Sequence, residues 1–187
     1  QAWSDTGLAY EIIAMDPGQE LTGTLLEMWN NLRLRGISRW VSPSLKAQAE
    51  RSSFTTLQAL RAGVFTQEPI GIATSADSII MVMSALPPTT PLTELGEDAS
   101  DEVLDRAWEQ LRFAHSRGIS HRALTPEAVV VDESSDVWLL DWDEGEVATT
   151  ELNQSIDIAQ MLVLTALAVG PERALEAGRR NVGEATL

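Results

Sequence analysis

The stretch from His115 to Asp143, HSRGISHRALTPEAVVVDESSDVWLLDWD, decides the fold of this chain. It begins at the end of a predicted helix and continues through a loop that contains histidine, arginine and proline. Two short apolar segments follow, at 128–131 and 137–140, with a polar turn between them. Short apolar runs bounded by turn residues are typical of buried strands. The sequence therefore predicts a helix, a loop and a strand pair that ends on an aspartate.

The residues before this stretch predict a mixture of strands and helices. Strand composition and helical spacing of apolar residues give, in chain order, a strand over 8–15, helices over 19–34 and 44–62, and strands over 64–73 and 78–84. The last of these strands is apolar throughout, as expected of a strand covered on both faces. Pro87 and Pro88 then stiffen the connection to the second half of the chain.

The second half is predicted to be mainly helical. Ser100 is a good N-cap for a helix that runs to Ser116, and the acidic residues in its first turn favour the helix dipole. The remaining elements are an acidic, Thr-rich link over 144–151, an apolar helix over 156–170 opened by Asp157, and a last helix over 171–180. Together these elements predict an α+β fold.

Composition limits the classes of function. A chain of 187 residues suffices for one domain or for two small lobes that share a cleft. Its net charge of −15 argues against nucleic acid and against an anionic membrane surface as direct ligands. The absence of cysteine excludes disulfides and thiolate chemistry, and two histidines make a zinc site improbable. Residence in the cytoplasm is expected.

The sequence predicts no membrane insertion by this chain. Its longest apolar run, 158–169, contains Gln160 and Thr165 and is shorter than the roughly 20 residues that a membrane span needs. The chain starts at Gln1, without the basic and apolar segments of a signal peptide. We expect it to be a piece of a longer protein.

The order of helix, Gly-Ile-x-His-Arg loop, strand pair and aspartate resembles the catalytic core of the protein-kinase-like fold. In that family the loop reads His-Arg-Asp-x-x-x-x-Asn, and a metal-binding aspartate begins Asp-Phe-Gly. His121 and Arg122 match the start of the loop. Ala123 stands where the catalytic aspartate would be, and Ala128 replaces the metal-binding asparagine. The resemblance thus implies degenerate catalytic positions.

The resemblance also implies a two-lobed fold, with a reduced N-lobe over 1–86 and a minimal, mainly helical C-lobe over 87–187. Asp141-Trp142-Asp143 stands for Asp-Phe-Gly. Asp141 would hold a nucleotide-bound metal if one binds, and Asp143 or Glu127 would be the second carboxylate ligand. No cofactor is expected, with Mg-ATP as the alternative.

A phosphate-clamping lysine is missing from the first predicted strand. By position, Glu11 or Ile13 stands nearest to it, and an acidic residue there would repel phosphate. The single lysine of the chain, Lys46, lies in a later segment. Glu50 is the candidate for the helix glutamate that would pair with the strand lysine. The loss of lysine, catalytic aspartate and asparagine together argues for a pseudokinase.

Structural roles are implied for three residues of the matched region. His121 would support the loop by packing, and Asp157 would hydrogen-bond the backbone of the His-Arg loop. Arg122, if buried, needs an anionic partner, which Asp157 or a carboxylate within 141–146 would supply.

The pattern is similar to a narrower group, the kinase-like N-terminal domains of actinobacterial membrane proteins related to lysylphosphatidylglycerol synthase. The shared residues are Leu-x-x-Met-Trp at 25–29, Arg-Ala-Gly-Val at 61–64 and Asp-Ile-Ala-Gln-Met-Leu at 157–162. This implies a regulatory or scaffolding domain on the cytoplasmic side of a fused transmembrane region, with that region or another protein as partner. An atypical or small-molecule kinase, or a nucleotide sensor, remains the alternative.

Overall fold

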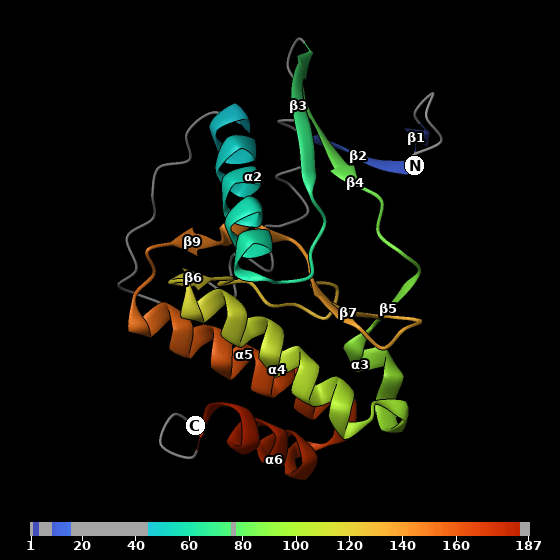
Figure 1. Ribbon diagram of the computed structural model, residues 1–187, viewed down its shortest axis with the longest axis vertical. Helices are drawn as coiled ribbons and strands as arrows, with labels where there is room; N and C mark the ends of the chain where they lie inside the picture. The colour runs from blue at the N-terminus through green and yellow to red at the C-terminus, as the bar shows by residue number, and fades with distance from the viewer. Residues whose placement is uncertain (1, 4–8, 16–44, 76–77, 184–187) are drawn as a thin grey trace, which may run out of the picture.

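The computed structural model describes residues 2–3, 9–15, 45–75 and 78–183, and it has the predicted mixed α+β composition with small sheets (Figure 1). A sheet with helix α2 lies at one end of the molecule, and helices α4, α5 and α6 lie at the other. The helix predicted over 19–34 falls outside the described residues.

The first sheet is antiparallel and has the order β1-β2-β4-β3. Its strands are β1 (Ala2–Trp3), β2 (Ala9–Met15), β3 (Pro69–Ser75) and β4 (Ser78–Ser84). The strand predicted over 64–73 is wrong in its first half. The Phe65 N–H donates to Gln110 Oε1 at 2.7 Å, and the Phe65 carbonyl accepts from the Leu139 N–H at 2.9 Å. These bonds take the backbone of this segment away from the sheet.

Helix α2 (Leu45–Ala62) matches its predicted range and covers the sheet formed by β3 and β4. Ala49 of α2 packs in a small core with Ile79, Met81 and Met83, the alternate residues of β4. This packing buries one face of β4 against α2. The sheet and α2 together form one unit of the fold.

A second antiparallel sheet lies beyond the prolines. β5 (Thr89–Pro91) pairs with β7 (Val129–Asp132), which pairs with β8 (Val137–Leu139). The predicted strand pair is confirmed to within a residue at its ends, whereas β5 was not predicted. β5 leads into the short helices α3 (Leu92–Leu95) and η2 (Gly96–Asp98).

The helical half consists of α4 (Asp101–Ser116), α5 (Glu151–Val169) and α6 (Pro171–Val182). The predicted Ser100 cap is confirmed, since its hydroxyl accepts from the Val103 N–H. Helix α5 begins earlier than predicted, because Thr150 caps it by accepting from the Asn153 N–H. Asp157 therefore lies inside α5 and does not open it, which corrects the prediction.

The main core joins α2, the strands β7 and β8 and the helices α4, α5 and α6 around Trp108 of α4, Leu139 of β8 and Met161 of α5, each with at most 1% of its surface exposed. Two further short strands, β6 (Ile119–Ser120) and β9 (Glu146–Val147), pair beside it. The pairing brings the start of the His121 loop next to the segment that follows Asp141.

Candidate functional site

The loop that starts at His121 is held in place by Asp157. The Asp157 side chain is fully buried, and its two carboxylate oxygens accept from the N–H groups of His121 at 2.8 Å and Arg122 at 2.6 Å. These are the hydrogen bonds that the kinase resemblance implied. Arg122 has a positive φ of 68°, which an arginine rarely adopts. The charge-assisted bonds to Asp157 offset the cost of this conformation.

His115 is a partner of Asp157 that sequence reasoning missed. Its Nε2 lies 3.0 Å from Asp157 Oδ2. The His115 carbonyl accepts from Gln154 Nε2, so α4 and α5 are linked twice at this point. No local pattern could indicate the contact, because the residues come from different helices and meet only through tertiary packing.

His121 packs inside the protein. Its Nε2 lies 2.6 Å from the Leu140 carbonyl, so this nitrogen carries the proton and donates it. The ring lies 4.6 Å from that of Trp142, centroid to centroid. Burial lowers the pKa of His121 below its usual value and keeps the ring neutral. With its Nδ1 also buried, His121 presents no nitrogen to an external substrate.

The side chain of Arg122 pairs with Glu146, one of the carboxylates within 141–146 that were predicted as its possible partners. Its Nη1 lies 3.6 Å from Glu146 Oε2, and Asn153 Nδ2 donates to the same oxygen at 2.6 Å. The pair links the loop to β9 and to the first turn of α5. Arg122 thus has a structural partner in this arrangement.

Asp141 follows β8 in a left-handed conformation, with φ and ψ both 59°. Its side chain is exposed at the surface, but neighbouring parts of the protein keep some of the surrounding water away from it. This partial burial is the main cause that raises the pKa of Asp141, and the carboxylates of Asp143, Glu11 and Glu127 raise it further. Negative charge therefore accumulates at the position where the resemblance places a metal.

Asp143 is bound to α2. Its Oδ1 accepts from the Ser52 hydroxyl at 2.6 Å. Within the described residues, no three or more histidine, cysteine, aspartate or glutamate side chains are grouped so that they could hold a metal ion. Asp141 and Asp143 lie on one turn. The negative charge of Glu127, the other predicted ligand, also raises the pKa of Asp141.

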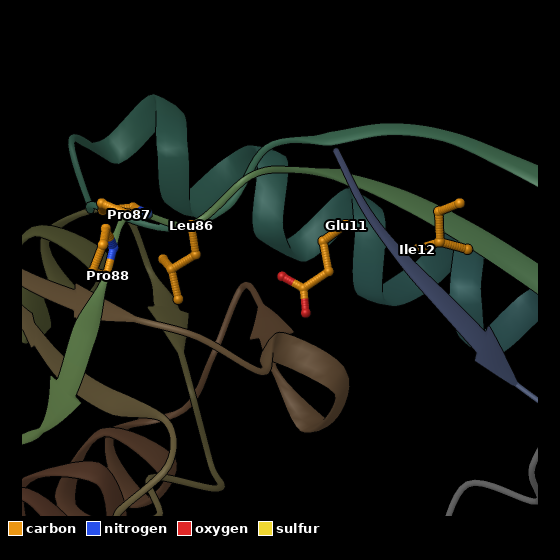
Figure 2. Close-up of a pocket in the computed structure, with 5 residues that line it drawn as sticks. All are labelled: Glu11, Ile12, Leu86, Pro87 and Pro88. Atoms are coloured by element: carbon orange, nitrogen blue, oxygen red, sulfur yellow. The ribbon is translucent and has the colours of Figure 1, made fainter. Parts of the chain in front are cut away.

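A cavity of about 410 Å³ lies between β2 and the connection to β5, and it is lined by Glu11, Ile12, Leu86, Pro87 and Pro88. Figure 2 shows the Glu11 carboxylate pointing toward the segment after Asp141, while the Ile12 side chain points away. Gln67 Nε2 donates to Glu11 Oε2 at 2.6 Å and fixes its orientation. A carboxylate thus lies in the cavity where a phosphate-binding site would need a cation.

The remaining sequence candidates contribute no polar group to the cavity. Ala123 is half-buried and Ala128 fully buried, so neither position offers a base or an amide oxygen. Lys46 and Glu50 pair with each other at 3.8 Å, one turn apart and both exposed. Glu50 was the candidate to pair with a lysine of the first strand, and β2 contains no lysine. The lysine that Glu50 pairs with instead lies on its own helix.

Helix α2 is fastened to the turn that follows Asp141. Besides the Ser52–Asp143 bond, Arg51 Nη2 donates to the Gly145 carbonyl at 3.2 Å. The backbone of Gly145 packs tightly: a Cβ atom there would lie 2.6 Å from Thr55 Cγ2. Sequence reasoning missed this contact, although a glycine after an Asp-Trp-Asp turn was the signal that could have indicated it.

Comparison with protein-family models and with curated proteins found no match to this chain.

Proposed function

We propose that this chain is a kinase-like domain without phosphoryl-transfer activity, which acts by binding as a regulatory or scaffolding domain. One contrast carries the proposal. Asp157 holds the His121–Arg122 loop as the resemblance requires, yet Ala123 and Ala128 occupy the positions that would orient the hydroxyl and bind metal. Phosphoryl transfer needs positioned groups and neutralisation of phosphate charge, and neither alanine supplies them.

The electrostatics of the cavity support the same proposal. By the resemblance, Glu11 or Ile13 stands nearest to the position where a lysine would hold phosphates; of the two, Glu11 lines the cavity, and its charge acts on Asp141 together with those of Asp143 and Glu127. These carboxylates would repel the phosphates of a nucleotide, and solvent at the exposed Asp141 weakens this repulsion without reversing it. A nucleoside triphosphate would meet this repulsion, and among the residues that the structure describes no lysine or arginine lines the cavity to offset it.

The proposed architecture has a reduced N-lobe over 1–86 and a minimal C-lobe over 87–187, with the cavity of Figure 2 between them. The proposed location is the cytoplasmic face of a larger membrane protein, and the proposed partner is another protein or the fused transmembrane region. The net charge of −15 supports a partner other than nucleic acid.

Thermal melts with ATP, ADP and GTP, each with Mg²⁺, Mn²⁺ or EDTA, test the proposal. We expect no nucleotide-dependent shift. A ligand at about 100 times its Kd would add about 2.7 kcal/mol to stability, and in a chain of this size the Tm would rise by roughly 5–10 °C.

Asp141→Ala is the matched variant for the melts. A metal-dependent shift that disappears in Asp141→Ala would contradict the proposal and favour a nucleotide sensor. Transfer of labelled phosphate from ATP to a protein or small-molecule acceptor would favour an atypical kinase instead.

A further inference from the structure

The outer face of α5 exposes an apolar stripe. Leu152, Val163 and Leu167 have 61%, 58% and 65% of their surface exposed, and Ala159 is exposed between them. Steps of seven, four and four residues place all four on one side of the helix, and the exposed Ser155 lies beside Leu152 and Ala159. The opposite side of α5, which carries Asp157 and other residues, is buried in the core.

The stripe contains no charge over most of the helix. From Leu152 to Val169 the one charged residue is Asp157, which is buried. By comparison, the exposed side of α4 carries charged residues such as Asp101 and Arg112. Isolated exposed apolar side chains are common, but a continuous apolar strip rimmed by polar residues marks an interaction site.

Helix α5 is long and apolar enough to cross a membrane by length and composition alone, but about a third of it is buried inside the fold. The buried third includes the Asp157 carboxylate that holds the His121 loop. Helix α5 is thus an integral part of the core, and its apolar outer face needs a different explanation.

Acidic side chains lie at both ends of α5, and Arg173, just beyond its C-terminal end, is paired with Asp101. At the C-terminal end, the exposed side chains of Glu94, Glu97 and Asp98 belong to α3 and η2, which pack against α5. Exposed Glu172 follows the end of α5, and exposed Glu151 begins it. These carboxylates form an acidic rim at the two ends of the stripe. The rim would attract a partner whose own apolar strip is flanked by lysine or arginine residues.

We propose that the outer face of α5 is the docking site for a partner helix whose apolar side is flanked by lysine or arginine residues. The inference rests on the proposed function as a binding domain and gives the chemistry of its partner. The acidic rim disfavours the other occupants: it repels an anionic lipid surface, and a second copy would bring two acidic rims together.

Fluorescence anisotropy with a labelled amphipathic peptide tests this surface. A peptide of about 20 residues, with leucines on one side and lysines flanking them, would as a helix span about 30 Å, close to the length of α5. We expect it to bind the 187-residue chain. The triple variant Leu152→Gln, Val163→Gln, Leu167→Gln should weaken binding by about tenfold or more, since anchor side chains dominate such contacts.

The matched control is Phe54→Gln with Leu57→Gln, which removes exposed apolar surface from α2 at 53% and 38% exposure. This pair should leave peptide affinity unchanged. Glu97→Gln with Glu172→Gln should weaken binding and flatten its salt dependence, because rim charges are screened beyond about 10 Å at 0.1 M salt.

Three results would overturn the inference. The first is equal affinity of the triple α5 variant and the wild type. The second is equal affinity for a peptide with glutamates in place of the lysines. The third is a dimer, seen by light scattering, that the triple variant abolishes, since a second copy would then occupy the face. None of these results depends on nucleotide binding, so the inference and the proposed function can fail separately.

Discussion

At the scale of single residues, one buried carboxylate organises the site. Asp157 accepts from the backbone of His121 and Arg122 and contacts His115. A buried charge is tolerated only when hydrogen bonds replace its hydration. The position of the His121 loop therefore depends on the charge of Asp157.

Asp157→Asn tests this dependence. The amide group would turn its NH₂ toward a backbone N–H, leaving two buried donors facing each other. We expect a loss of about 2–3 kcal/mol in the free energy of unfolding, measured by urea denaturation. Asp105→Asn is the control: Asp105 pairs with Arg180 at the surface, where such pairs contribute at most about 1 kcal/mol. Equal losses in both variants would contradict this role.

The ionised carboxylate of Asp141 is predicted to lower the free energy of unfolding at neutral pH. Its pKa is raised in the folded protein by burial and by neighbouring carboxylates. A raised pKa means that the folded state binds the proton more tightly, so stability falls as pH rises from the unfolded pKa through the folded one. Asp141→Asn should therefore raise stability at pH 7, by no more than about 1 kcal/mol because solvent screens the group.

The gain from Asp141→Asn should disappear near pH 3, where the carboxyl group is protonated in both states. Urea denaturation at both pH values measures it. The control is Asp136→Asn. Asp136 is a surface carboxylate that pairs with Arg106 and does not belong to the group of carboxylates around Asp141, so its replacement should give no gain in stability at pH 7. A gain that persists at low pH would assign the effect to packing instead of charge.

What could be predicted about single residues depended on whether their partners were local. The resemblance predicted the hydrogen bonds of Asp157 to the His121 loop, which the structure contains, whereas the roles that it implies for Asp141, Ala123 and Ala128 stay predictions. The sequence could not indicate the contact between His115 and Asp157, or the hydrogen bond from Gln67 that orients Glu11. Those contacts depend on how distant elements pack.

At the scale of elements, α2 packs closely against the turn after Asp141. Gly145→Ala tests it, because the added Cβ would lie 2.6 Å from Thr55 Cγ2 and 3.0 Å from the Trp142 carbonyl oxygen. Since Gly145 has a φ of −60°, the expected effect is steric and involves no backbone strain. Overpacking of this kind costs about 1–3 kcal/mol.

Thr55→Ser provides the matched rescue for Gly145→Ala. It removes the Thr55 methyl group but keeps the hydroxyl that donates to the Arg51 carbonyl. In the double variant, urea denaturation should recover part of the loss, giving a coupling energy of about 0.5 kcal/mol or more. Strictly additive effects would show that α2 does not bear on this turn.

Element boundaries were predictable where the signals were local. Helices α2 and α4 and strands β4, β7 and β8 agree with prediction to within a residue or two at each end. The early start of α5 at Glu151 had a signal in Thr150, a residue type that caps helices. The irregular path at Phe65 had none, because its partners, Gln110 and Leu139, lie far along the chain.

At the scale of the whole molecule, a net charge of −15 should make stability depend on salt. Self-repulsion of the folded chain opposes compactness, and added salt screens it. We expect unfolding free energy in urea to rise by on the order of 1 kcal/mol between low salt and about 0.2 M NaCl. The rise should shrink toward the isoelectric point of about 4.4. A fall with salt would mean that surface ion pairs outweigh the repulsion.

The overall class of the fold was predictable, whereas its assembly was not. Periodicity and turn residues predicted strands mixed with helices before the prolines and mainly helices with one strand pair after them, and the structure adds the short strands β5, β6 and β9 to the second half. The pairing of β5 with β7 and of β6 with β9 joins residues 26 to 43 positions apart in segments that carry no matching pattern. Such pairings depend on tertiary geometry, which one sequence does not display.

Pro87 and Pro88 occupy the short connection between the two sheets. Ser84 at one end is bonded to Gln67 and Glu68, and Thr89 at the other pairs with Asp132. Because proline fixes φ and carries no amide hydrogen, the connection has few bonds about which to rotate. The two sheets should then unfold cooperatively, so that fluorescence and circular dichroism follow a single coincident transition.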